Sequence, residues 1–374
     1  MRVIGVRGEK TADEKGYNQM KGEKTMHKIN ARLVSMTVRA VVVTTFAVMS
    51  LMSLTTAVTA EAANITVGKT TSGSGFHIPA YVAMDQGFFK REGLKAKWVA
   101  MSGKALLNAG IAKQIDFVPI PGGGSVAALR GAPIIYLVGQ SLISQWTITS
   151  PKSIKSVKDL KGKTLGLGRP GSADYDEAEI VLGQNFGLDA GKDYKVISFR
   201  GEAERIAALI NGDIQGAALS FPHAAKAKVA GFKVLLKTGT YLPRVGGSFW
   251  THKDYLKKHR ATVKKFIRAI AKAELFMRTH KEETVGVIKK YFAMKDRKEA
   301  AGVYDEVYDQ YGPDLPESLV KKLFKSRVKR MIKKGNWPKN KPLPDLEQFV
   351  ARDLLTQTLR EMGYYLQAPP ALRQ

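Results

Sequence analysis

The chain has 374 residues, of which 44% are hydrophobic, so it can bury a sizeable core in two domains or two large lobes. It contains no cysteine, which excludes disulfides, thiolate metal sites, a cysteine nucleophile and the lipidated cysteine of an anchored bacterial lipoprotein. The formal net charge of +27 is compatible with nucleic acid, an anionic surface or an anionic ligand as a partner. The positions of the charged residues decide between these partners.

Residues 1–62 have the pattern of an N-terminal extension followed by an export signal. An apolar run at 40–54 follows basic residues and precedes small residues, which is typical of a cleaved secretory signal peptide. At a rise of about 1.5 Å per residue the run spans about 22 Å, which is short for a membrane anchor. We expect cleavage near Ala60 or Ala62 and a periplasmic protein, with Met1 and Met26 both open as the start.

After the signal, strand and helix patterns alternate regularly. Strands are predicted at residues 65–67, 96–101, 115–120 and 133–138, and helices at 78–90, 104–113 and 126–130. The stretch from Pro121 to Ser125 contains three consecutive glycines and is predicted as a loop before the last of these helices. Repeated strand–loop–helix units of this length predict a mostly parallel sheet with helices on both faces.

A second series of the same kind begins near residue 158. Strands are predicted at 165–167, 194–199, 214–219 and 232–236. Helices are predicted from after Ser172 to about 186, at 202–211, and from the turn at 220–223. This series predicts a second, smaller α/β lobe.

From residue 254 onward the pattern is helical. Val263, Phe266, Ile267 and Ile270 follow the spacing of one apolar helix face, and we expect the C-terminal helices to pack against the first lobe. Basic residues concentrate at 257–272 and 321–341, where their spacing predicts a solvated helix face. An anionic solute or an acidic membrane surface stays open as the purpose of this charge, whereas export argues against nucleic acid.

Three stretches carry a resemblance to a known family. They are IPAYVAMDQGFFKREG at 78–93, VKDLKGKTLG at 157–166 and ALINGDIQGA at 208–217. In this order they resemble the solute-binding proteins of the nitrate/sulfonate/taurine group of ABC importers, which are relatives of the thiamine-precursor binding proteins. The resemblance covers roughly residues 64–310.

The resemblance implies a two-lobed type II periplasmic binding protein fold, α/β in class, with mostly parallel sheets flanked by helices and extra C-terminal helices. Lobe one would comprise 64–145 plus 246–374 and lobe two 146–245, with crossings near 140–150 and 241–250. It also implies a monomer that captures a small molecule and delivers it to an ABC permease and ATPase complex in the inner membrane. No cofactor and no metal are implied.

Candidate ligand-binding residues lie where predicted strands lead into helices. In open α/β sheets ligands bind outside the carboxyl ends of the strands, where helix N-termini favour an anionic or hydrogen-bond-accepting group. The candidates are Thr71, Ser72, Gly73, Ser74, His77, Ser102, Gly103, Gly122, Gly123, Ser125, Trp146, Arg169, Gly171, Ser172, Tyr175, Arg200, Ser220 and His223. Each type has a structural alternative: helix caps for the hydroxyl residues, a flexible turn for the glycines, solvated charge for the arginines and core packing for the aromatic residues.

The same fold also supports functions other than solute capture. The thiamine-precursor synthases that the resemblance includes use a cysteine-rich iron segment, and a desulfinase would need a cysteine nucleophile, so the absence of cysteine predicts a binding protein rather than an enzyme. A sensor domain that signals to a separate partner is a further alternative. The sequence leaves the solute open among sulfonates, nitrate, pyrimidines and aromatic acids.

Overall fold

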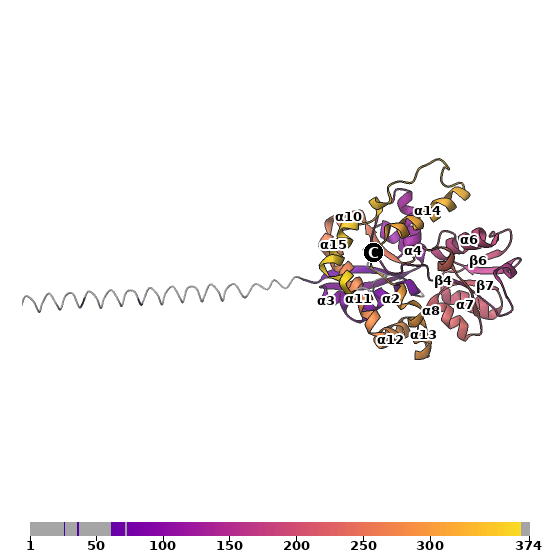
Figure 1. Cartoon of the computed structure of the whole chain (residues 1–374), viewed down its shortest axis with the longest axis horizontal. Coiled ribbons are helices and arrows are strands. Elements are labelled where there is room, and N and C mark those ends of the chain that lie inside the picture. The colour runs from indigo at the N-terminus through magenta and orange to yellow at the C-terminus, as the bar shows by residue number, and fades with distance from the viewer. Residues whose placement is uncertain (1–25, 27–35, 37–60, 72, 368–374) are drawn as a thin grey trace, which may run out of the picture. The chain divides into compact units, whose positions relative to one another are not determined.

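The computed structural model describes residues 61–71 and 73–367, together with Met26 and Met36. The chain divides into two units, Met1–Ala60 and Glu61–Gln374. The apolar run of the expected signal and the candidate Ser72 lie outside the described residues. The second unit is an α/β structure of two lobes (Figure 1), which confirms the predicted fold class.

The first lobe begins with β1 (Ala63–Thr70), which pairs in parallel with β2 (Leu94–Met101). Its first helices and its third strand are η1 (Gly75–His77), α2 (Ile78–Asp85), α3 (Phe88–Arg91), α4 (Gly103–Ile111), α5 (Pro121–Leu129) and β3 (Ile134–Gly139). The predicted helix at 78–90 is divided in two because Gly87 has a φ of 71°, a left-handed conformation that ends an α-helix.

The second lobe is built on a five-stranded sheet in the order β6-β5-β7-β4-β8. Its elements are β4 (Trp146–Ser150), η2 (Val157–Leu160), β5 (Thr164–Leu167), α6 (Ala173–Phe186), β6 (Lys195–Ser198), α7 (Glu202–Asn211), β7 (Gly216–Ser220), α8 (Phe221–Val229), β8 (Lys233–Lys237) and α9 (Thr238–Tyr241). Neighbouring residues of β7 enter opposite cores: Ala218 packs with residues of η2 and α6, whereas Ala217 and Leu219 pack with α7 and α8. This alternation follows from the two-residue period of a strand and leaves helices on both faces.

Two short segments, 140–145 and 242–247, join the lobes and hydrogen-bond to each other. Gln140 N donates to Gly247 O at 2.9 Å, and Gly246 N donates to Ser141 O at 2.9 Å. The antiparallel pairs of the structure involve β4, which follows the first crossing, and β9 (Ser248–His252), which follows the second and pairs with β3. Sequence patterns missed both strands; the predicted lobe boundaries stay a proposal.

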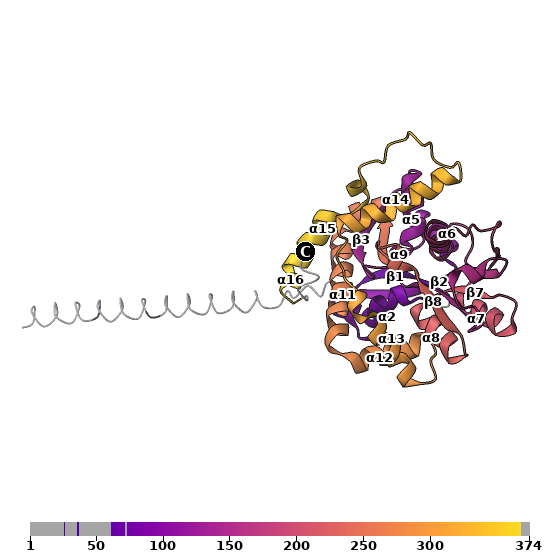
Figure 2. The ribbon, with the colours of Figure 1, turned by 45° about the vertical axis from the view of Figure 1, so that its right-hand side comes forward.

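The helices after β9 contact both lobes. They are α10 (Lys253–Lys258), α11 (Arg260–Thr279), α12 (Lys281–Tyr291), α13 (Arg297–Val307), η3 (Tyr308–Gln310), α14 (Glu317–Lys333), η4 (Leu346–Phe349), α15 (Arg352–Glu361) and α16 (Tyr364–Gln367). The predicted apolar stripe of α11 is fully buried in the first lobe. Helix α14 packs against α5 of the first lobe, whereas α13 packs against α8 of the second lobe, as Figure 2 shows. The expectation that these helices cap the first lobe is therefore only partly right.

Most lysines on the basic face of α14 are exposed, as predicted, but Arg327 and Arg330 are paired with acidic residues of the second lobe. Arg327 and Asp176 are both fully buried and lie 2.6 Å apart, and Arg330 contacts the other oxygen of Asp176 at 2.6 Å. Lys333 pairs with Asp189 at 2.6 Å. Helical spacing could not reveal this, because the partners lie far away in sequence.

The predicted strand at 115–120 is reduced to isolated bridges, at Phe117 with Val67 and at Val118 with Trp250. The carboxylate of Asp116 explains the interruption. It accepts from Thr66 N at 2.7 Å and from the Thr66 hydroxyl at 2.8 Å, so a side chain takes one place in the backbone ladder.

The predicted glycine loop at 121–125 is instead the first half of α5. Glycine costs about 1 kcal/mol relative to alanine inside a helix. Close packing explains these residues: a Cβ on Gly122 would collide with the guanidinium of Arg327, and a Cβ on Gly124 would lie 2.8 Å from Trp250 Nε1.

Candidate functional site

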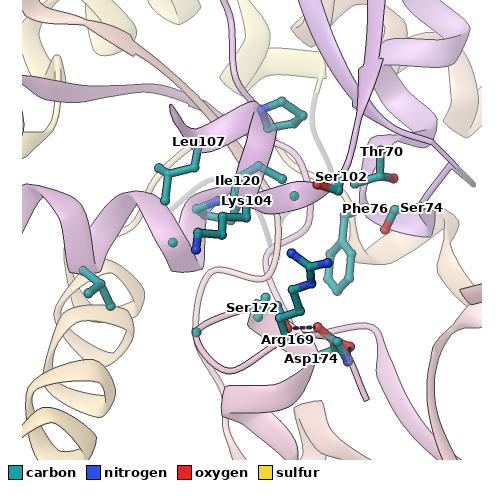
Figure 3. A pocket seen from close by; sticks show the side chains of 18 of the residues that line it. Thr70, Ser74, Phe76, Ser102, Lys104, Leu107, Ile120, Arg169, Ser172 and Asp174 are labelled. Carbon is teal, nitrogen blue, oxygen red and sulfur yellow. Dashed lines mark hydrogen bonds between the residues drawn. The ribbon is translucent and has the colours of Figure 1, made fainter. Parts of the chain in front are cut away.

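A cavity of about 740 Å³ opens where the strands of both lobes end and their helices begin. Its walls are formed by the segments after β1, β2, β5 and β6 and before α5, together with one face each of α4 and α5. Figure 3 shows side chains from these segments converging on one space. The cavity therefore lies at the strand carboxyl ends, the position at which open α/β sheets bind ligands.

Most of the predicted ligand-binding residues line this cavity. They are Thr71, Gly73, Ser74, His77, Ser102, Gly103, Gly123, Trp146, Arg169, Gly171, Ser172 and Arg200. The structure brings them together from both lobes, and their role as ligand contacts stays a prediction.

The remaining described candidates do not line the cavity. Gly122 faces Arg327, and Ser125 donates its hydroxyl to Gly122 O at 2.9 Å. Tyr175 is buried in the second lobe, with the Arg330 guanidinium 5.6 Å from its ring centroid. Ser220 and His223 lie behind the wall, where they hold Glu202.

Sequence reasoning missed residues that contribute to the walls. They include Thr70, Phe76, Lys104, Leu107, Ile111, Ile120, Val126, Arg130, Asp174, Phe199, Glu202 and Arg205. Asp174 and Glu202 stand in the first turns of α6 and α7, where acidic residues are expected on grounds of the helix dipole alone. Only the spacing of Leu107 and Ile111, one helical turn apart, offered a signal for the apolar wall.

Asp174 is held in place by the protein itself. Its carboxylate accepts from Gly168 N at 2.6 Å and from the Ser172 hydroxyl at 2.5 Å. Arg205 completes the set with an ion pair of 2.7 Å and also donates to Ala218 O. The predicted residue Ser172 thus fixes a carboxylate as well as facing the cavity.

Glu202 is held in the same way from behind the wall. It accepts from Ser220 N at 2.6 Å and from the Ser220 hydroxyl at 2.8 Å, and it lies 3.1 Å from His223 Nδ1. Burial raises the pKa of Glu202, but the charges of His223 and Arg205 and the hydrogen bonds outweigh burial and keep the pKa below its usual value. Glu202 is therefore an ionised structural anion.

His77 is only 3% exposed and lines the cavity with one ring nitrogen unpartnered. Its Nε2 lies 3.3 Å from Pro119 O, and because a carbonyl only accepts, Nε2 carries the proton. Burial lowers the pKa of His77 to about 4, so the ring is neutral at pH 7. The unpartnered Nδ1 is consequently a hydrogen-bond acceptor.

An aromatic pair joins the lobes inside the cavity. The rings of Phe76, from the first lobe, and Trp146, from the first strand after the crossing, have centroids 5.3 Å apart. The indole N–H of Trp146 is buried and has no partner among the described residues.

Four basic side chains complete the lining. Lys104, Arg130, Arg169 and Arg200 are exposed, and none forms an ion pair within residues 61–71 and 73–367. In Figure 3 the Arg169 side chain extends into the cavity, away from Ser172 and Asp174.

Two further observations concern metal binding and membrane-spanning helices. The part of the chain that the structure describes contains no group of three or more histidine, aspartate or glutamate side chains arranged to hold a metal ion. Within the same part, no helix has the length and apolar character needed to cross a membrane.

Comparison with known proteins supports the fold. The sequence model of a family described as NMT1/THI5 like matches residues 75–284, whereas a search of curated proteins finds no match. A protein of Bordetella bronchiseptica RB50 superposes with a TM-score of 0.70 at 16% identity, covering 81% of this chain and 99% of that one.

Two structures of named periplasmic binding proteins are also similar to this chain. The periplasmic aliphatic sulphonate binding protein SsuA of Escherichia coli has a TM-score of 0.63 at 19% identity and covers 76% of this chain and 91% of its own. The periplasmic nitrate-binding protein NrtA of Synechocystis PCC 6803 has a TM-score of 0.66 at 14% identity, with 83% and 92% covered. At these identities the likeness shows the shared fold.

Proposed function

The chain belongs to the NMT1/THI5-like family, and from this premise we propose that it is an exported solute-binding protein that captures a small molecule between its lobes and delivers it to an ABC importer. One observation carries the proposal: the cavity of about 740 Å³ is lined by strand-to-helix junctions of both lobes. A volume of this order is usual for a small-molecule site.

The crossing segments support capture by closure. They are short, they pair with each other, and Gly246 is so close to Ile143 O that a Cβ would collide with it. A narrow double connection of this kind allows two lobes to rotate about it while each keeps its own core. Trp146, which follows the first crossing, and Gly246, which lies in the second, both line the cavity, so movement at the crossings changes the site directly.

The two carboxylates at the cavity already have hydrogen-bond and ion-pair partners within the protein, which supports binding rather than catalysis. Asp174 and Glu202 already hold their protein partners, and neither is placed as a free general base. The absence of cysteine also removes the nucleophile expected of enzymatic relatives. The similarity to SsuA and NrtA, whose names state sulphonate and nitrate binding in the periplasm, supports the export and import parts of the proposal.

The proposal is tested on the full chain expressed with its own leader in a bacterial host. We expect the protein in the periplasmic fraction, with a mature N-terminus near residue 61 or 63 by mass spectrometry. Small molecules released by denaturation are identified by mass spectrometry and added back; at a hundred times the dissociation constant they add about 2.7 kcal/mol to the free energy of unfolding. A protein that releases no solute, and whose melting point no extract fraction or metabolite panel raises, does not have this function.

A further inference from the structure

The described carboxylates that line the cavity offer nothing to a cationic solute. Asp174 is neutralised by Arg205 at 2.7 Å, and Glu202 pairs with His223 at 3.1 Å. Each also accepts a hydrogen bond from a backbone N–H. A cation entering the cavity would have to break one of these buried arrangements, which leaves its former partner unpaired.

Apart from Arg205, the lysine and arginine side chains that line the cavity are not paired in this way. Lys104 and Arg130 from the first lobe and Arg169 and Arg200 from the second have no carboxylate partner in the described structure. Unpaired cations gathered around one cavity attract anions, and arginine suits carboxylate and sulfonate groups because it can donate two parallel hydrogen bonds. The charge of the cavity therefore favours an acidic solute.

The cavity also has an apolar wall that a small inorganic anion would leave unused. Leu107 and Ile111 on α4 and Ile120 and Val126 at α5 are partly exposed and line it. The Phe76–Trp146 ring pair lines it as well. Burying this surface stabilises a complex only if the solute carries an apolar body of its own.

Two buried polar atoms of residues that line the cavity have no hydrogen-bond partner within residues 61–71 and 73–367. They are Nδ1 of the neutral His77 ring, which is an acceptor, and the indole N–H of Trp146. Both residues line the cavity, and buried polar groups normally find a partner. A solute that carries a hydroxyl or amino group would supply the donor that Nδ1 lacks.

We propose that the solute is an organic anion with a ring-sized apolar body and a hydrogen-bond donor, whose acidic group meets Arg169 and Arg200 and whose donor meets His77. This inference rests on the proposed solute-binding function and narrows it, since it excludes nitrate and other small inorganic anions.

The class is tested by isothermal titration of the mature protein with matched probes at fixed ionic strength. Naphthoate is compared with its neutral amide, naphthamide, and with nitrate and acetate. We expect naphthoate to bind at least tenfold more tightly than each of the others. The double variant Arg169→Gln/Arg200→Gln should weaken naphthoate at least tenfold and leave naphthamide within twofold. The control Lys161→Gln/Lys163→Gln removes the same charge from exposed positions of the same lobe and should change neither.

The role of His77 is tested by adding a hydroxyl to the probe. Hydroxynaphthoate should bind at least fivefold more tightly than methoxynaphthoate in the unaltered protein, because only the first can donate to Nδ1. The variant His77→Phe should remove this preference. If that variant does not fold, the probe pair in the unaltered protein decides, and equal affinities overturn the role of His77.

The outcomes separate this inference from the function on which it rests. Nitrate or naphthamide binding as tightly as naphthoate overturns the anionic, ring-bearing class and leaves solute capture standing. If no probe binds, the solute released from the periplasmic protein decides: an organic anion supports the inference, and a cation, a neutral compound or an inorganic ion overturns it. If no solute is released either, and no extract fraction or metabolite raises the melting point, both proposals fail.

Discussion

The strongest test of the structure is to remove one partner of its most deeply buried ion pair, with Arg327→Met. Arg327 in α14 and Asp176 in α6 are both fully buried and 2.6 Å apart, so they link the C-terminal segment to the second lobe. The substitution leaves the buried carboxylate of Asp176 with Arg330, at 2.6 Å, as its remaining ion-pair partner among the described residues. Removing one partner of a buried pair costs about 3–5 kcal/mol. At roughly 2 °C per kcal/mol for a chain of this size, the melting temperature should fall by about 6–10 °C.

The same helix supplies the matched control. Lys321 pairs with Glu317 one turn away, and both side chains are about half exposed. Such a pair contributes about 0.3–0.5 kcal/mol, so Lys321→Met should lower the melting temperature by about 1 °C. Both variants are compared by calorimetry and by urea unfolding. The reasoning is refuted if the two variants lose the same stability.

A second substitution distinguishes loss of the pair from loss of packing. In Arg327→Met/Asp176→Leu both members of the buried pair are removed, and Arg330, which loses Asp176, keeps its ion pair with Glu179 at 2.7 Å. Replacing both members of a buried pair by apolar residues is often neutral. The double variant should recover at least half of the stability lost by Arg327→Met. A double variant that is less stable than the single one would mean that the methylene groups of Arg327, rather than its charge, hold α14 in place.

The remaining predictions concern other buried groups. Glu274 is 1% exposed with both oxygens unpartnered, and burial raises its pKa well above the usual value. The contribution of Glu274 to the free energy of unfolding is present below the pKa that it has in the unfolded chain, and it is lost as pH rises through its raised pKa in the folded protein. The variant Glu274→Met should therefore raise the melting temperature more at pH 8 than at pH 5, and the opposite order would refute this. Glu202 has a lowered pKa despite burial, so its contribution is present above about pH 4.3 and is lost as pH falls through the lower folded pKa. The variant Glu202→Gln should therefore flatten the fall in stability in acid titrations, and an unchanged profile would count against the site electrostatics. Gly122→Ala should destabilise, because its Cβ would collide with Arg327, whereas Gly286→Ala in α12 meets open space and should stabilise by about 0.5–1 kcal/mol; equal effects in urea unfolding would contradict the packing.

Local patterns predicted the fold class well because its elements are amphipathic over short windows. The stripe at Val263, Phe266, Ile267 and Ile270 is buried as predicted, and α7 has the predicted bounds. Strands β4 and β9 were missed because they are buried on both sides and lie directly after the crossings, where neither alternation nor a following helix marks them.

The candidate site was predictable to the extent that topology determines it. Junction residues such as Ser74, Ser102 and Gly171 line the cavity because parallel strands end at one edge. The apolar wall and the partners of Asp174 and Glu202 depend on side-chain contacts between distant elements. The three glycines show the limit plainly: a loop and a tightly packed helix require the same residue for different reasons, and only Arg327 and Trp250 distinguish them.

The basic residues behind the net charge of +27 have different roles when they are buried and when they are exposed. Arg327 is fully buried against Asp176, so salt screens this pair little. Arg169 and Arg200 are exposed at the cavity and form no ion pair with the described residues, and at 0.1 M salt charges beyond about 10 Å are already screened from them. Raising the ionic strength should therefore weaken anion capture well before it loosens the link between α14 and α6. The net charge counts both kinds of residue together, whereas the structure separates arginines that hold α14 against α6 from arginines that line the cavity.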